Sequence, residues 1–207
     1  HIKVDTMQRS EDGTVKNAVR LHDGLVVESV LIPTETRTTA CVSSQVGCSL
    51  DCNFCATARL KRMRNLEVAE IVDQVALIDR QSKLYFDRPL SNIVFMGMGE
   101  PMMNYKNVVE SIRKITDPKG LGMSPRRITV STSGIPKMIK MLADENLRVK
   151  LALSLHSAIE KKRNEIMPFS DKFPLTDIMD SLKYWYEKTG NIITFEYCVW
   201  KGINDQD

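Results

Sequence analysis

Three cysteines, spaced so that they could hold one metal centre, are the residues of this sequence best suited to chemistry. Cys48, Cys52 and Cys55 form a C-x3-C-x2-C run, and Cys41 lies seven residues before it. A closed structural zinc site or a fully ligated cubane cluster needs four protein ligands. Three thiolates leave one coordination position open, and a substrate or cofactor can bind there. The spacing therefore favours a [4Fe-4S] cluster with one free iron.

Two other interpretations of the three cysteines remain open on spacing alone. A zinc site would need a fourth ligand, which Cys198 or His156 could supply. The thiols could also be buried and free, because free cysteine packs like a small apolar residue.

Composition indicates a folded domain in a reducing compartment. The chain has 207 residues, of which 43% are hydrophobic and 27% charged, with a net charge of +3. It has no apolar run near the ~20 residues of a membrane span and no visible signal peptide. Five clustered cysteines do not suggest a secreted disulfide framework. We expect a cytoplasmic monomer without membrane contact, and the mild positive charge permits an anionic partner.

Strand and helix patterns alternate along most of the chain. Helix-spaced apolar residues occur at 66–82, 108–115, 136–142, 160–166 and 175–187, and β-prone runs occur at 38–43, 91–98, 127–132, 149–155 and 192–199. The 91–98 run is nearly all apolar, as expected of a strand buried on both faces. This alternation predicts an α/β fold with a parallel sheet, either open or curled into a partial barrel.

An N-terminal β-hairpin is predicted before this core. Two β-prone runs within residues 14–32 flank Asp23-Gly24, a dipeptide typical of tight hairpin turns. We therefore expect an N-terminal extension over residues 1–37 and a core over residues 38–207.

Polar motifs follow four of the predicted strands. They occupy residues 48–55, 97–101, 131–134 and 154–156. In parallel α/β folds the active site forms at the carboxyl ends of the strands, so these motifs should meet. Residues 59–64 add four basic side chains, which could touch phosphate or simply form a solvated loop. The basic residues at 119–127 and 161–163 are expected on helix and loop surface.

Together the motifs resemble those of the RlmN/Cfr family of radical S-adenosylmethionine (SAM) RNA adenine methyltransferases. The stretches that carry the likeness, in the same order, are Cys41-Val-Ser-Ser-Gln-Val-Gly-Cys48, Arg64-Asn-Leu66, Met96-Gly-Met-Gly-Glu-Pro101, Ser131-Thr-Ser-Gly134 and Ser154-Leu-His156. The likeness runs from about Leu21 to the end of the chain. It implies a partial (β/α) barrel of the radical SAM type, preceded by the β-hairpin.

The resemblance implies two cofactors. Cys48, Cys52 and Cys55 would hold a [4Fe-4S] cluster whose open iron chelates SAM and whose electron cleaves SAM to a 5′-deoxyadenosyl radical. Further SAM contacts would come from Gly99, Glu100, Ser131, Ser154, Leu155 and His156. In that role the glycine lets the backbone approach closely and the carboxylate accepts from the SAM amine.

The resemblance also implies catalytic roles for Glu28 and Cys41. Glu28 matches the family's proton acceptor, although by pattern it is an ordinary strand carboxylate. Cys41 matches a cysteine that releases the RNA adduct by forming a disulfide with a methyl-carrying cysteine near the family's C-terminus. Cys198 falls in a strand of the family's middle region, where we expect a small core residue.

The implied activity is methylation of C2 of adenine, at adenosine 2503 of 23S rRNA and adenosine 37 of tRNA. It would proceed through a methyl-cysteine intermediate with an electron donor such as flavodoxin. Alternatives are C8 methylation, another radical SAM reaction, or a zinc-stabilised nucleic-acid-binding module. The sequence lacks the family's N-terminal helical domain and its methyl-carrying cysteine. We therefore expect a chain truncated at both ends that binds the cluster and SAM without turning over on RNA.

Overall fold

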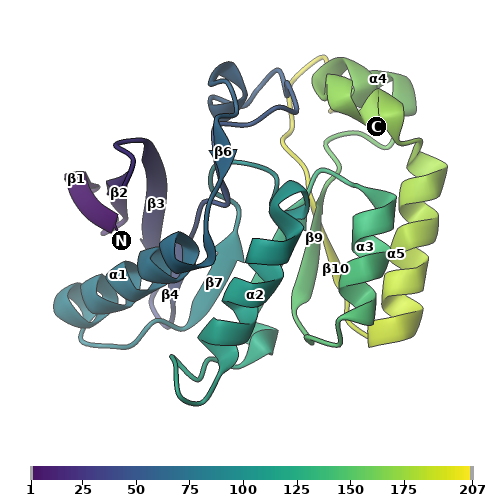
Figure 1. The fold of residues 1–207 in the computed structure, drawn as a ribbon. Coiled ribbons are helices and arrows are strands. Elements are labelled where there is room, and N and C mark those ends of the chain that lie inside the picture. Colours follow the sequence, from purple (N-terminus) through teal and green to yellow (C-terminus); the bar gives the residue numbers. More distant parts are fainter. Residues whose placement is uncertain (1, 206–207) are drawn as a thin grey trace.

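The computed structural model describes residues 2–205 and places eight strands in one sheet, in the order β1-β2-β3-β4-β7-β8-β9-β10 (Figure 1). These strands are β1 (Ile2–Arg9), β2 (Val15–Leu21), β3 (Val26–Pro33), β4 (Thr38–Cys41), β7 (Asn92–Phe95), β8 (Ile128–Thr132), β9 (Lys150–Ser154) and β10 (Ile193–Glu196). The pairs from β1 to β4 are antiparallel, and those from β4 to β10 are parallel. The predicted α/β sheet is confirmed.

Helices follow the strands of the parallel part. They are α1 (Val68–Phe86), α2 (Tyr105–Thr116), α3 (Pro136–Asp144), α4 (Glu160–Ile166) and α5 (Leu175–Thr189). Helix α1 shows why they form here. Its buried Ile71, Val75 and Ile78 share one face, and Glu67 and Glu70 form a capping box at its start. The five predicted helical segments are confirmed within a few residues.

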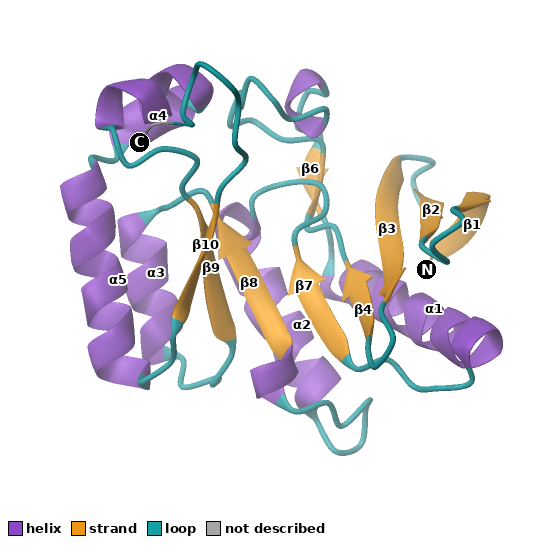
Figure 2. Cartoon of the chain, turned by 180° about the vertical axis from the view of Figure 1, so that it is seen from behind, coloured by secondary structure: helices purple, strands orange, loops and turns teal. Residues whose placement is uncertain are grey.

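Helices α1, α2, α3 and α5 pack on one face of the sheet, and Figure 2 shows the strands from the opposite side. The burial of β7 agrees with this arrangement, because it alternates along the strand. Ile93 and Phe95 are buried, whereas Asn92 and Val94 are partly exposed. The prediction of a strand buried on both faces is therefore wrong for β7. Within residues 2–205, helices cover only one of its faces, which gives the arrangement of a partial (β/α) barrel.

The N-terminal part has one strand more than the predicted hairpin. The hairpin itself is confirmed, with Gly24 at φ +83° in the turn between β2 and β3. Strand β1 pairs with β2 and was missed because both its faces are largely exposed and polar. Val30 of β3 pairs with Cys41 of β4, so a single sheet runs across residue 37. The division into an extension and a core stays a prediction.

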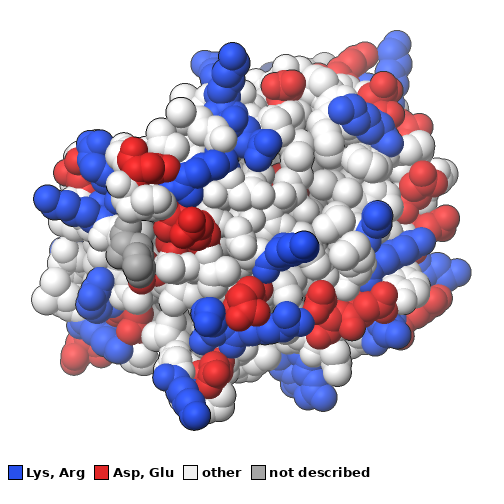
Figure 3. Space-filling model, viewed as in Figure 1, with Lys and Arg blue, Asp and Glu red and all other residues white. Residues whose placement is uncertain are grey.

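Charged side chains of both signs are spread over the face of the molecule seen in Figure 3. Among the helices that the structure describes, each is too short or too polar to cross a bilayer.

Candidate active site

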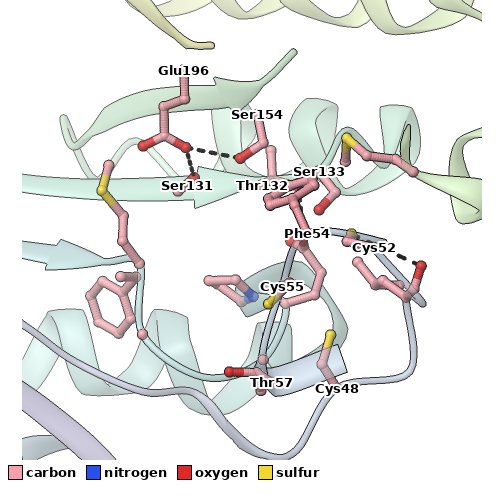
Figure 4. A pocket seen from close by; sticks show the side chains of 18 of the residues that line it. Cys48, Cys52, Phe54, Cys55, Thr57, Ser131, Thr132, Ser133, Ser154 and Glu196 are labelled. Atoms are coloured by element: carbon pink, nitrogen blue, oxygen red, sulfur yellow. Dashed lines mark hydrogen bonds between the residues drawn. The ribbon is translucent and has the colours of Figure 1, made fainter. Parts of the chain in front are cut away.

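A pocket opens where the parallel strands end and the cysteine loop folds over them (Figure 4). Its walls come from the loop, from the turn after β7 and from the ends of β8, β9 and β10. The predicted site residues that line it are Cys48, Cys52, Cys55, Gly99, Glu100, Ser131, Ser154 and His156. The polar motifs at the carboxyl ends of the strands therefore meet, as expected, although some of these residues are more than 100 positions apart in the chain.

The cysteine loop is fixed at its base and its tip. The short strands β5 (Gln45–Val46) and β6 (Arg64–Asn65) pair antiparallel and bring the two ends of the loop together. The N–H of Cys48 donates to the carbonyl of Leu60 at 3.3 Å. At the tip, the N–H of Asn53 donates to the carbonyl of Ile166 at 3.0 Å. These bonds hold the three thiols towards the strand ends.

The three thiols give a donor set that fits a cluster with one open iron. Cys48, Cys52 and Cys55 all line the pocket. A closed zinc site needs four protein ligands. A cubane cluster held by three thiolates has one iron without a protein ligand. Among residues 2–205, no group of three Cys, His, Asp or Glu side chains is arranged as a site for a single metal ion.

Burial favours the protonated form of Cys48 and Cys52 when no cation is beside them. Burial raises the pKa of Cys48, and it raises the pKa of Cys52 to about 12, with repulsion from neighbouring thiolates adding to the effect. Thiolate ligation requires a positive centre that offsets this cost, so a cluster bound here would release protons.

Glu100 is the buried carboxylate of the pocket. Its Oε1 accepts from the N–H of Met102 at 3.0 Å, and its Oε2 accepts from the N–H of Ser133 at 2.8 Å. Burial raises the pKa of this carboxyl, although the two N–H donors act to lower it. Glu100 therefore ties the turn after β7 to the turn after β8. The side chains of Thr132 and Ser133 also hydrogen-bond to this carboxylate and act to lower its pKa.

The two glycines before Glu100 pack against the chain that leads into the cysteine loop. A Cβ at Gly97 would lie 2.7 Å from the backbone carbonyl of Val42, and one at Gly99 would lie 2.4 Å from Cβ of Gln45. Gly99 also has φ +94°, which disfavours any L side chain. We predicted close backbone approach to a cofactor at Gly99. The close approach observed is to Gln45, whose Oε1 accepts from the N–H of Glu100.

Glu196, at the end of β10, is the acidic pocket residue that the sequence analysis missed. Its Oε2 accepts from the hydroxyls of Ser131 and Ser154, both at 2.8 Å (Figure 4). The two predicted serines are therefore organised by a common carboxylate. Glu196 is a polar residue at the carboxyl end of a β-prone run, and the same position marked the other predicted site residues. The sequence therefore contained a signal for it.

His156 is buried and held in one orientation. Only 4% of its surface is exposed, and its Nδ1 accepts from the N–H of Cys198 at 3.1 Å. Its ring lies edge-on to Phe54 with the centroids 4.7 Å apart. Burial lowers the pKa of His156 and favours the neutral ring. An acceptor role for Nδ1 leaves the proton on Nε2, which can donate to a ligand. Leu155, which precedes His156, packs against the core and does not line the pocket.

Arg163 contradicts the expectation of a basic surface patch at 161–163. It is 1% exposed, and its guanidinium donates to the carbonyls of Ser133 at 2.6 Å and Leu155 at 3.2 Å. It therefore links the chain segments that follow β8 and β9. The sequence alone did not distinguish it from its exposed neighbours.

The two predicted catalytic residues, Cys41 and Glu28, are not part of the pocket lining. Cys41 ends β4 as a free thiol, and burial raises its pKa to about 11. Glu28 lies on β3, half-exposed, with its carboxylate 2.6 Å from the ammonium of Lys16. Cys198 is exposed, so the expectation of a core residue there is wrong. It follows the end of β10, beyond the packed part of the strand. All five cysteines are free.

This arrangement defines a class: a parallel α/β sheet whose strand ends face a thiol-rich loop. The model of the radical SAM superfamily matches residues 42–207. The chain belongs to this superfamily.

Several known proteins are similar to the chain over nearly its whole length. A "Probable dual-specificity RNA methyltransferase RlmN" of Flavobacterium psychrophilum is 76% identical over 205 residues, covering 99% of this chain and 59% of that protein. A protein with the same description from Thermus thermophilus is 45% identical, covering 95% and 55%. A radical SAM methyltransferase from Sphaerobacter thermophilus has a similar crystal structure, with a TM-score of 0.96, 39% identity, and coverage of 100% and 60%. The chain thus spans about three fifths of the length of these relatives.

Proposed function

We propose that this chain is the core of a radical SAM enzyme that methylates C2 of adenine in RNA, at adenosine 2503 of 23S rRNA and adenosine 37 of tRNA. The observation that carries the proposal is the joining, in one pocket, of three thiols, a buried carboxylate and a serine pair held by Glu196. Relatives described as dual-specificity RNA methyltransferases support the choice of RNA.

Cys48, Cys52 and Cys55 would hold the [4Fe-4S] cluster, which when bound supplies the electron for reductive cleavage of SAM. Glu100 would accept from the SAM amine, and its position in the pocket lining supports this role. Ser131 and Ser154, both bonded to Glu196, form a polar wall that suits the hydroxyls of a ribose. The apolar part of the pocket wall, including Phe95 and Met96, keeps water away from the reacting atoms.

Cys41 and Glu28 are proposed to act on the RNA intermediate after methyl transfer. Cys41 would form the disulfide that releases the product, and Glu28 would accept a proton. In support, Cys41 lies at the end of β4, next to Met96 of the pocket wall, whose backbone donates to its sulfur. A raised pKa keeps this thiol protonated until a base removes its proton. Electrons are proposed to come from a small redox protein such as flavodoxin.

Anaerobic reconstitution with iron and sulfide tests the cofactor part. The expected product is a brown protein with about four irons per chain that cleaves SAM when dithionite is added. Cys52→Ala should lose the iron, whereas Cys198→Ala should keep it, because Cys198 lies outside the pocket lining. A colourless protein with one zinc per chain contradicts the proposal.

RNA hairpins test the substrate part. A hairpin carrying adenosine 2503 and an anticodon stem-loop carrying adenosine 37 should both bind the reconstituted chain. Replacing the target adenine by guanine should weaken binding, because the exocyclic group at C2 occupies the position to be methylated. Equal affinity for all hairpins would argue against adenine-directed recognition.

A further inference from the structure

A basic loop that the pocket does not use follows the last cysteine. Arg59, Lys61 and Arg62 are exposed, and within residues 2–205 their side chains make no hydrogen bond or ion pair. The next basic residue behaves differently. Arg64 is paired with Asp23 at 2.6 Å and with Glu70 at 2.8 Å. Three of the four basic residues in this run are therefore available to a partner, and the fourth anchors the loop.

The backbone beneath these three side chains is fixed. The N–H of Met63 donates to the carbonyl of Val46 at 2.9 Å, which closes this end of the loop. Gly47, at φ +73°, lies so close to the loop that an added Cβ would be 2.2 Å from the carbonyl oxygen of Lys61. A braced backbone presents the charged groups in a set direction and loses less entropy on binding.

The loop borders the mouth of the pocket. Thr57 lines the pocket, and the short helix η1 (Thr57–Arg59) leads directly from it to the basic residues. Figure 3 shows Lys and Arg side chains gathered over the region of β6, at the top of the view. From residue 48 to residue 63 the chain has three basic residues and a single acidic one, Asp51. The rim therefore has a positive charge that the site chemistry does not require.

Apolar side chains are interleaved with the charges. Leu60 is 52% exposed and Met63 is 62% exposed. Alternating cations and apolar groups match a nucleic acid strand, which offers phosphates and base faces in turn.

We propose that Arg59, Lys61 and Arg62 bind backbone phosphates of the RNA strand that carries the target base. The inference rests on the proposed function, because a base entering the pocket brings its flanking phosphates to this rim. Phosphate contacts fix the position of the strand without reading its sequence. They also make binding depend on salt, because each contact releases counterions.

The test compares two triple variants with the same change in charge. The first is Arg59→Gln, Lys61→Gln and Arg62→Gln. The control removes the exposed Lys119, Arg126 and Arg148, which lie at the amino ends of the strands and likewise make no described side-chain bond. RNA hairpin affinity is measured by fluorescence anisotropy from 50 to 300 mM KCl, and SAM cleavage with dithionite is measured in parallel.

For the loop variant, the slope of log affinity against log salt should become less steep by about 2, because each of the three lost phosphate contacts contributes ~0.7 to the slope. At 0.1 M salt this corresponds to binding that is up to about a hundredfold weaker. The control variant should bind RNA like the parent chain. Both variants should still cleave SAM, which separates this inference from the proposed function.

Two results would overturn the inference. One is a loop variant that binds RNA with an unchanged slope and affinity. The other is a loop variant that keeps RNA binding but is reduced more slowly by an acidic electron-transfer protein, which would assign the loop to that partner. A parent chain that binds RNA in a loop-dependent manner but never cleaves SAM would refute the proposed function and leave the inference standing.

Discussion

Replacing Gly99 by alanine should destabilise the protein more than alanine at Gly24, which also has positive φ but an open surrounding. Two separate costs arise at Gly99. At φ +94° an L residue is strained by about 1–2 kcal/mol. Its Cβ would also lie 2.4 Å from Cβ of Gln45, and relieving such overpacking costs about 1–3 kcal/mol.

Moving Gln45 has a further consequence for the site. Its Oε1 accepts from the N–H of Glu100 at 2.9 Å, and losing that buried bond costs about 1 kcal/mol more. The expected total for Gly99→Ala is therefore about 3–6 kcal/mol in the free energy of unfolding. Affinity for SAM should fall with it, because the shift moves Glu100.

Two other glycines separate the costs. Gly24 has φ +83° but nothing within 4 Å of an added Cβ, so Gly24→Ala should cost only the ~1–2 kcal/mol of strain. Gly97 lacks the positive φ but meets the carbonyl of Val42 at 2.7 Å, so Gly97→Ala should cost about 1–3 kcal/mol. Urea unfolding followed by circular dichroism measures all three. Similar losses for Gly99→Ala and Gly24→Ala would refute the steric part of the reasoning.

Three further predictions concern titratable side chains. Iodoacetamide should label the exposed Cys198 readily at pH 8, but should label Cys41 only as the pH approaches the Cys41 pKa of about 11. Labelling is measured by mass spectrometry, and equal labelling of the two cysteines at pH 8 would contradict the burial of Cys41. Glu196→Gln should weaken SAM binding in equilibrium dialysis about five- to tenfold, because a neutral acceptor holds the two serine hydroxyls less firmly, while stability changes little. Glu70→Gln should cost about 3 kcal/mol at pH 7, because Arg64 loses its buried partner. Burial opposes ionisation of Glu70, but its bonds to Arg64 and to the N–H of Glu67 lower its pKa on balance. The stabilisation is therefore lost as the pH falls through that lowered pKa, and urea titrations of the two proteins should converge in acid.

Sequence periodicity predicted the parallel core because burial there follows simple rules. Helix α1 has its apolar residues on one face and a capping box at its start, and both features can be recognised without a structure. Strand β7 shows the limit of this reasoning. Its apolar run indicated burial on two sides, yet Val94 is partly exposed, since the number of layers depends on the remainder of the fold. Strand β1 was missed for a related reason, because backbone pairing with β2 holds it without an apolar face.

The site was predictable where several residues form a motif and less so where a single residue contributes. The cysteine triplet and Glu100 belong to motifs of several residues. Glu196 is a single acid in the run Phe195-Glu196-Tyr197, and only the fold shows that it meets two serines from other strands. Arg163 likewise stands among exposed basic residues and differs from them only in where helix α4 places it.

The register of the sheet explains which of these residues can meet a common substrate. Partners across the strands lie on the same face, and alternate residues along a strand share a face. Val30 pairs with Cys41, Cys41 with Val94, and Glu196 with Ser154.

By the same parity, Glu28 shares the face of Cys41, and Ser131 shares that of Ser154. All of them lie on the face opposite the helices. A one-residue slip in β4 would turn Cys41 towards α1 and replace it by the buried Ala40, so the catalytic roles proposed for Cys41 and Glu28 depend on this register rather than on their spacing in the sequence.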